Sequence, residues 1–189
     1  MNTTVRFTEE ELDRCWELGQ SRHNQARSNG SVCRLEQGME KQPFHIDYIG
    51  ALGELAYCKA YGLPVSLVLE DDRQSLEALQ QGDINHNGVW VDIKTSEHET
   101  ARLIYPVEKK HRCKADYLCL VVVQGNTAVV KGFCKSDNFM REENIGRLRE
   151  SRPLYILSQD RLEKKPYFLS INKNEGFRNS NIFDFRTSF

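Results

Sequence analysis

The stretch GDINHNGVWVDIKTS, residues 82–96, decides how we interpret this chain. Residues 88–94 contain β-branched and aromatic side chains and begin at an Asn-Gly turn signal, which predicts a strand. Side chains two positions apart on a strand share a face, so Asp92 and Lys94 should point the same way, about 7 Å apart. The alternate residues are predicted to face the core, namely Val89, Val91 and Ile93.

A second carboxylate, that of Asp83, precedes this strand. Mg²⁺ binds oxygen ligands and keeps several waters, so two carboxylates and a substrate phosphate suffice for a site. A bound cation polarises phosphoryl oxygens, and Lys94 can position the attacking water or stabilise developing charge. The pattern therefore fits metal-dependent hydrolysis of a phosphodiester. A bare Asp-x-Lys tripeptide is more often an exposed pair without chemistry, so the surrounding sequence must decide.

Upstream, His45–Tyr61 has apolar residues at the spacing of an amphipathic helix. Gly62, with Pro64 beyond it, is a typical stop signal for that helix. Small residues allow a helix to approach a sheet closely, so Glu54 is predicted to reach the groups that the sheet displays. Its small neighbours are Gly50, Ala51, Gly53 and Ala56.

In these residues the sequence resembles the PD-(D/E)XK, or restriction-endonuclease-like, nuclease superfamily. The superfamily pattern is an acidic residue on a first helix, then an Asp, then (D/E)-x-K on the following strand of a central sheet. The matching residues are Glu54, Asp83, Asp92 and Lys94. The resemblance covers residues 46–123, about two fifths of the chain. One position departs from the pattern, because Gly82 rather than Pro precedes Asp83.

The resemblance implies a three-layer α/β/α fold with a mixed central sheet and a catalytic role for those four side chains. The implied ligands of Mg²⁺ or Mn²⁺ are Asp83, Asp92 and the backbone carbonyl of Ile93, with Glu54 as a further candidate. The implied activity is that of an endonuclease, with DNA as the default substrate and RNA left open. The size of the chain is similar to that of small phage-encoded nucleases.

Length and composition are typical of one compact globular domain, with 189 residues of which 39% are hydrophobic. We expect a single nuclease-like domain over residues 1–189, with its core at about 46–134. No run approaches the roughly 20 apolar residues of a membrane span, and the first residues do not resemble a secretory signal. A cytoplasmic location is therefore expected, in the host cytoplasm if a phage encodes the chain.

The two ends of the chain carry weaker signals. Thr8 and Glu11 make a capping box, which predicts a first helix over residues 9–26. The polar residues 22–30 at its end are expected to form a solvated connection, with a mobile substrate-contacting flap as the alternative. The aromatic tail, residues 176–189, is expected to pack on the domain or on a second copy, which would make a homodimer.

The formal net charge of −1 gives no global attraction to phosphate, so contact with nucleic acid must be local. A basic run lies between two strands predicted for the central sheet, over residues 102–107 and 117–123. We predict that this run contacts a phosphate backbone, although a solvated basic turn is an equally good interpretation. The predicted contacts are Lys109, Lys110, Arg112, Lys114 and Arg102. A further strand over residues 127–134 is expected to form a hairpin with the strand before it.

Other interpretations receive less support from the sequence. The six cysteines form no C-x-x-C pair, so reduced, partly buried thiols are expected. A zinc site would need His111, Cys113 and Cys119, whose spacing fits no common finger. His86 and His98 are expected to face solvent.

Two other functional classes stay open. The chain could keep a nuclease fold without turnover and act through protein or nucleic-acid contacts, as an anti-defence protein would. It could also hydrolyse nucleotides or other small phosphoesters with the same metal chemistry.

Overall fold

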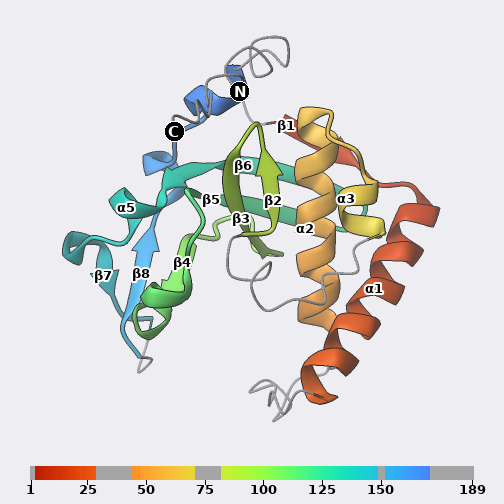
Figure 1. The fold of residues 1–189 in the computed structure, drawn as a ribbon, viewed down its shortest axis with the longest axis horizontal. Helices are drawn as coiled ribbons and strands as arrows, with labels where there is room; N and C mark the ends of the chain where they lie inside the picture. The colour runs from red at the N-terminus through yellow and green to blue at the C-terminus, as the bar shows by residue number, and fades with distance from the viewer. Residues whose placement is uncertain (1–2, 29–43, 71–81, 149–151, 171–189) are drawn as a thin grey trace, which may run out of the picture.

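A computed structural model describes residues 3–28, 44–70, 82–148 and 152–170 (Figure 1). The fold mixes helices with two β-sheets, which confirms the α/β class. None of the described helices is long and apolar enough to cross a membrane. In chain order the elements are β1 (Thr3–Arg6), α1 (Glu9–Ser28), α2 (His45–Tyr61), α3 (Ser66–Leu69), β2 (Ile84–His86), β3 (Val89–Ser96), β4 (Leu103–Pro106), η1 (Val107–Arg112), β5 (Tyr117–Gln124), β6 (Thr127–Lys135), α5 (Ser136–Phe139), η2 (Glu142–Asn144), β7 (Ile145–Gly146), β8 (Leu154–Leu157), η3 (Gln159–Arg161) and η4 (Tyr167–Ser170).

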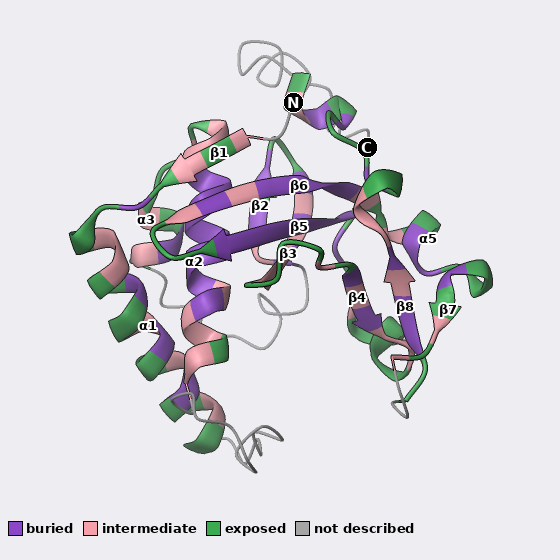
Figure 2. Ribbon diagram, turned by 180° about the vertical axis from the view of Figure 1, so that it is seen from behind, coloured by how far each residue is buried: buried purple, intermediate pink, exposed green. Residues whose placement is uncertain are grey.

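The larger sheet has five strands in the order β1-β6-β5-β3-β2. Strands β3 and β5 are parallel, and the other three pairs are antiparallel. The predicted β5–β6 hairpin is confirmed, and it turns at Gly125, whose positive φ of 58° favours glycine. Strand β5 is buried on both faces over almost its whole length (Figure 2), as expected for the middle strand of this sheet.

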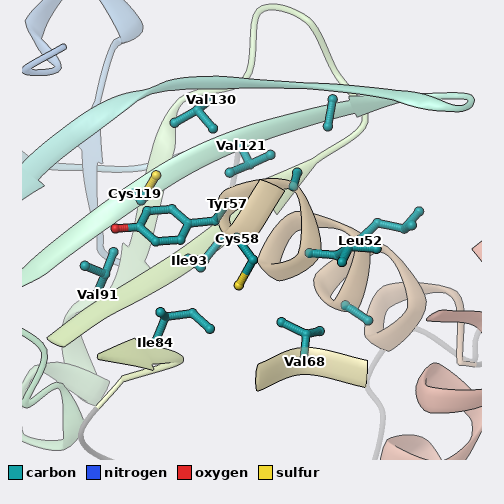
Figure 3. Packing of buried hydrophobic residues seen from close by; sticks show 14 of the residues in the cluster. Leu52, Tyr57, Cys58, Val68, Ile84, Val91, Ile93, Cys119, Val121 and Val130 are labelled. Atoms are coloured by element: carbon teal, nitrogen blue, oxygen red, sulfur yellow. The ribbon is translucent and has the colours of Figure 1, made fainter. Parts of the chain in front are cut away.

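Helix α2 crosses one face of this sheet and contacts β1, β3, β5 and β6 (Figure 1). Its bounds agree with the sequence prediction. The helix ends where Gly62 adopts a left-handed φ of 65° and donates its N–H to the Cys58 carbonyl. The main apolar core lies between α2 and the sheet (Figure 3), and its members include Leu52, Tyr57, Val91, Ile93 and Val121.

Helix α1 packs on α2 and begins at the predicted capping box. The Glu11 N–H donates to Thr8 Oγ1 at 3.2 Å, and the Thr8 N–H donates to Glu11 Oε2 at 2.8 Å. The helix continues to Ser28, two residues past its predicted end, so residues 22–28 belong to the helix and not to the connection predicted over residues 22–30. Contacts with α2 explain the longer helix, because His23 is buried with its Nδ1 3.4 Å from a carboxylate oxygen of α2.

The smaller sheet has the order β4-β8-β7 and packs near the start of β5 (Figure 1). The predicted strand at residues 102–107 therefore exists as β4, but its placement in the central sheet is wrong. Leu103 and Tyr105 of β4 are buried with Leu118 and Leu120 of β5 in a second apolar core. In the described ranges this second core, which Phe139 and Met140 also join, packs on the face of β5 opposite α2, and the second helical layer stays a prediction. Alternation of apolar residues predicted the strand but did not specify its partner.

His86 is buried, so the expectation that it faces solvent is wrong. Its Nδ1 shares a 2.8 Å hydrogen bond with the Tyr57 hydroxyl, and its ring packs edge-on against Phe168. His98 is exposed, as expected.

The five cysteines in the described part of the chain are free thiols, as predicted. Cys119 lies in the core under α2, whereas Cys113 packs against the core of the smaller sheet, so the set considered for zinc does not converge. The aromatic tail predicted to pack on the domain lies outside the described residues.

Candidate active site

The candidate site lies where β3 extends past its neighbour β2. Strand β2 pairs only with residues 89–91, so the rest of β3 has no β2 partner on that edge. Val91 and Ile93 are buried beneath α2, and Asp92 and Lys94 alternate with them onto the other face. The predicted alternation of β3 is therefore confirmed.

Asp83 lies beside the free end of β3, just before β2 begins. Its N–H donates to the Val91 carbonyl at 2.9 Å, and its Oδ2 accepts a 2.6 Å hydrogen bond from the Ile93 N–H. The N–H and C=O of one strand residue point to the same edge. The Ile93 carbonyl therefore also points toward the edge at which Asp83 lies.

The glycine that departs from the superfamily pattern has a backbone reason. Gly82 has a φ of 135°, a conformation that proline, with φ fixed near −65°, cannot adopt. A Cβ at this position would lie 3.2 Å from the Val91 carbonyl oxygen and 3.3 Å from the Ala115 Cβ. Glycine thus allows the chain to enter the site beside β3.

Asp92 and Lys94 form an ion pair, with 2.5 Å between Lys94 Nζ and Asp92 Oδ1. The Lys94 ammonium also lies 5.3 Å from the centre of the Tyr105 ring, a cation–π contact with the smaller sheet. The Lys94 side chain is 35% exposed and that of Asp92 is 13% exposed. Lys94 is therefore oriented by its neighbours and still accessible to water.

Glu54 comes from α2, which approaches β3 closely because residue 53 is glycine. A Cβ on Gly53 would lie 1.8 Å from Thr95 Oγ1. Glu54 itself is buried, and its two carboxylate oxygens accept hydrogen bonds from the two terminal nitrogens of Arg22, each at 2.8 Å. This bidentate pair fixes the Glu54 carboxylate and connects α1 to the site.

Sequence reasoning missed Arg22 as a site residue. No motif marks it, and residues 22 and 54 meet only because α1 packs along α2. The predicted helix over residues 9–26 already contained Arg22, but no signal in the sequence showed that this helix packs along α2 with the Arg22 guanidinium toward Glu54.

The acidic groups of the site act on one another. Burial and the nearby charges of Asp92 and Glu54 raise the pKa of the Asp83 carboxyl well above its ordinary value, although Lys94 and the Ile93 N–H act to lower it. Burial lowers the pKa of Lys94, but the carboxylates of Asp92 and Asp83 outweigh it, so its pKa is raised and it stays protonated. The other three predicted side chains, Glu54, Asp92 and Lys94, thus lie within electrostatic reach of Asp83.

The donor groups supply part of the oxygen-ligand set that a hard cation needs. No group of three or more His, Cys, Asp and Glu side chains in the described ranges could hold a metal ion. Asp83, Asp92 and the Ile93 carbonyl form an oxygen-only set of the kind that Mg²⁺ uses together with water and substrate oxygens. Glu54 is held by Arg22, which favours a supporting position over a direct ligand.

The predicted nucleic-acid contacts lie on a different connection from the one expected. The 3-10 helix η1 joins the smaller sheet to β5, so the basic run does not connect two strands of the central sheet. All five side chains are exposed, and their contact with nucleic acid stays a prediction. They are Lys109, Lys110 and Arg112 on η1, Lys114 in the following loop, and Arg102 before β4.

Comparison of the chain with protein-family models, with curated proteins and with solved structures found no match in any of the three. The geometry of the site therefore carries the functional argument.

Proposed function

We propose that the chain is a metal-dependent nuclease that hydrolyses phosphodiester bonds, with DNA as its expected substrate. The observation that carries the proposal is the meeting of Asp83, Asp92 and Lys94 at the free end of β3, with Glu54 beside them on α2. The mixed sheet with α2 across one face also supports a variant of the restriction-endonuclease-like fold.

Asp83, Asp92 and the Ile93 carbonyl are the proposed ligands for Mg²⁺ or Mn²⁺. When bound, such a cation polarises a phosphoryl oxygen and lowers the pKa of a coordinated water. The side chains around the proposed ligands hold them in position and set the charge of the site. Arg22 holds Glu54 in one orientation, and Glu54 adds negative charge beside Asp83, which favours a cation there.

Lys94 has the proposed role of positioning the attacking water. Asp92 fixes the direction of its ammonium, and the raised pKa keeps that ammonium charged. In the reaction, the water oxygen forms a bond to phosphorus, the bond to one ester oxygen breaks, and a proton ends on the leaving oxygen. The positive charge of Lys94 stabilises the negative charge that develops on the phosphoryl group.

The test is incubation of supercoiled, linear and single-stranded DNA, RNA and mononucleotides with the protein in Mg²⁺, Mn²⁺ or EDTA. Lys94→Ala is expected to lose cleavage by at least about a hundredfold, the effect of removing a group that stabilises transition-state charge. Lys165→Ala, which removes an exposed lysine on the segment after β8, is the matched control and should cleave like the parent.

Cleavage of polynucleotides that needs the cation and Lys94 would support the proposal. Equal cleavage by the parent and Lys94→Ala would remove Lys94 from the mechanism. Turnover of mononucleotides alone would instead indicate a small-phosphoester hydrolase.

One observation favours a non-catalytic role as a second candidate. Arg22 pairs with Glu54 and Lys94 pairs with Asp92, so four of the site's charges are balanced without a cation. Calorimetric titration with Mn²⁺ separates the two candidates. A nuclease should bind Mn²⁺ and lose that binding in Asp92→Ala, whereas a binding or anti-defence protein should bind Mn²⁺ in neither form.

A further inference from the structure

A polar pocket lies beside the candidate site, between the loop that leads into β5 and the end of β6. Its volume is about 330 Å³. Three lysines line it, two from the basic run and the third, Lys135, from the end of β6, which distinguishes it from a solvated basic turn. The charged and hydroxyl-bearing residues around it are Lys110, Lys114, Lys135, Ser136, Asp116 and Asp137.

Backbone contacts fix the walls of this pocket. Ser136 Oγ donates to the Ala115 carbonyl at 2.6 Å, and the Ser136 N–H donates to the Asp116 carbonyl at 2.9 Å. Across the pocket, Lys110 Nζ donates to the Met140 carbonyl at 3.0 Å. The two sides are thus connected by hydrogen bonds, and Lys110 is held at the wall.

The pocket suits an anion more than a cation. The Asp116 carboxylate accepts a 2.8 Å hydrogen bond from the Trp90 N–H, so one of its oxygens points toward β3. The lining has three lysine ammonium groups against the two carboxylates of Asp116 and Asp137, so its net charge is positive. Lysine binds phosphate as a compact point charge that needs no fixed geometry.

The pocket also lies close to the proposed catalytic groups. The Trp90 N–H donates to the Asp116 carboxylate, and the Asp116 N–H donates to the Trp90 carbonyl. Trp90 precedes Asp92 by two residues on β3, which is about 7 Å along the strand. Cys113, which lines the pocket, has a pKa raised by burial and by the charge of Asp92, so the two regions adjoin. Successive phosphates on one strand are about 3.4 Å apart along the duplex axis, so a pocket that adjoins the catalytic groups can receive the phosphate of a nearby nucleotide.

We infer that this pocket binds a backbone phosphate of the nucleic-acid substrate, near the phosphodiester that is cleaved. The inference rests on the proposed function and adds Lys135 and the pocket geometry to the exposed basic run. Free phosphate shares the same chemistry, so the experiment must distinguish the two sources.

The experiment measures binding separately from cleavage. Fluorescence anisotropy in EDTA, where the proposed reaction cannot proceed, follows a labelled oligonucleotide from 50 to 200 mM salt for the parent and for Lys114→Gln with Lys135→Gln. Lys110 is kept, because its ammonium also bonds the Met140 carbonyl. The paired control, Arg6→Gln with Lys165→Gln, removes two exposed positive charges that neither line the pocket nor belong to the predicted nucleic-acid contacts.

The pocket variant is expected to bind at least about fivefold more weakly than the control, with a salt slope lower by about 1, the value for one lost phosphate contact. Thermal unfolding shows whether both variants fold like the parent. Equal affinities for the pocket and control variants would overturn the inference, as would a parent that binds no oligonucleotide. Loss of inorganic phosphate binding with unchanged oligonucleotide binding would overturn it too, by assigning the pocket to free phosphate. The cleavage assay with Lys94→Ala tests the proposed function independently of this binding experiment.

Discussion

Replacement of Asp83 by Asn tests the physical basis of the site, because it should stabilise the protein without metal and remove metal binding. Asp83 is the carboxyl on which burial, Asp92 and Glu54 all act to disfavour the charged form. Asn has the same shape, and its Oδ1 can still accept the Ile93 N–H. Removing one of three crowded negative charges should raise the free energy of unfolding by about 1–2 kcal/mol, as for other strained functional sites.

The temperature scale follows from the size of the chain. For a domain of this length, 1 kcal/mol corresponds to roughly 2–4 °C in Tm, so Asp83→Asn should melt about 2–8 °C above the parent in EDTA. Metal should narrow or reverse this difference in Tm. Mn²⁺ at about a hundredfold over its Kd stabilises a protein that binds it by about 2.7 kcal/mol, or roughly 5–11 °C. The variant, without one of the two carboxylate ligands, should shift by less than about 2 °C under the same conditions.

The assay is thermal unfolding of both proteins across a Mn²⁺ titration and in EDTA. Asp13→Asn is the matched control, because Asp13 is exposed on α1 and outside the site, and it should follow the parent in both conditions. The reasoning is refuted if Asp83→Asn melts below the parent in EDTA, or if it gains as much stability from Mn²⁺ as the parent does.

Two further predictions concern how the helices support the site. Gly53→Ala should destabilise the protein by about 2 kcal/mol, because the new Cβ would lie 1.8 Å from Thr95 Oγ1. Gly50→Ala should instead raise the free energy of unfolding by up to about 1 kcal/mol, because the new Cβ would have no atom within 4 Å. Urea unfolding of both variants checks this contrast. Burial raises the pKa of Glu11, but hydrogen bonds from Lys59 and the N-terminus of α1 outweigh it, so the folded pKa is lowered from its ordinary 4.5. Glu11→Gln should therefore lower the free energy of unfolding by about 1 kcal/mol above pH 4.5. This difference from the parent should disappear as the pH falls through the lowered pKa of Glu11. Equal losses of stability at pH 7 and pH 3 would contradict the prediction.

The sequence by itself determined the elements that depend on neighbours in the chain. The capping box at Thr8, the stop at Gly62 and the alternation along β3 follow from spacing over a few residues. That alternation also identified Asp92 and Lys94 as a pair on one face, since the strand period is set by backbone geometry.

Tertiary structure decided where those elements meet. Strand β4 joins the smaller sheet because its apolar face matches β5 and β8, which no local pattern specifies. Arg22 reaches Glu54 only when α1 lies along α2, and the 135° φ of Gly82 brings Asp83 to the Ile93 N–H at the free end of β3. Local spacing fixes which way a side chain points, whereas the burial of apolar surface between distant segments fixes what it faces.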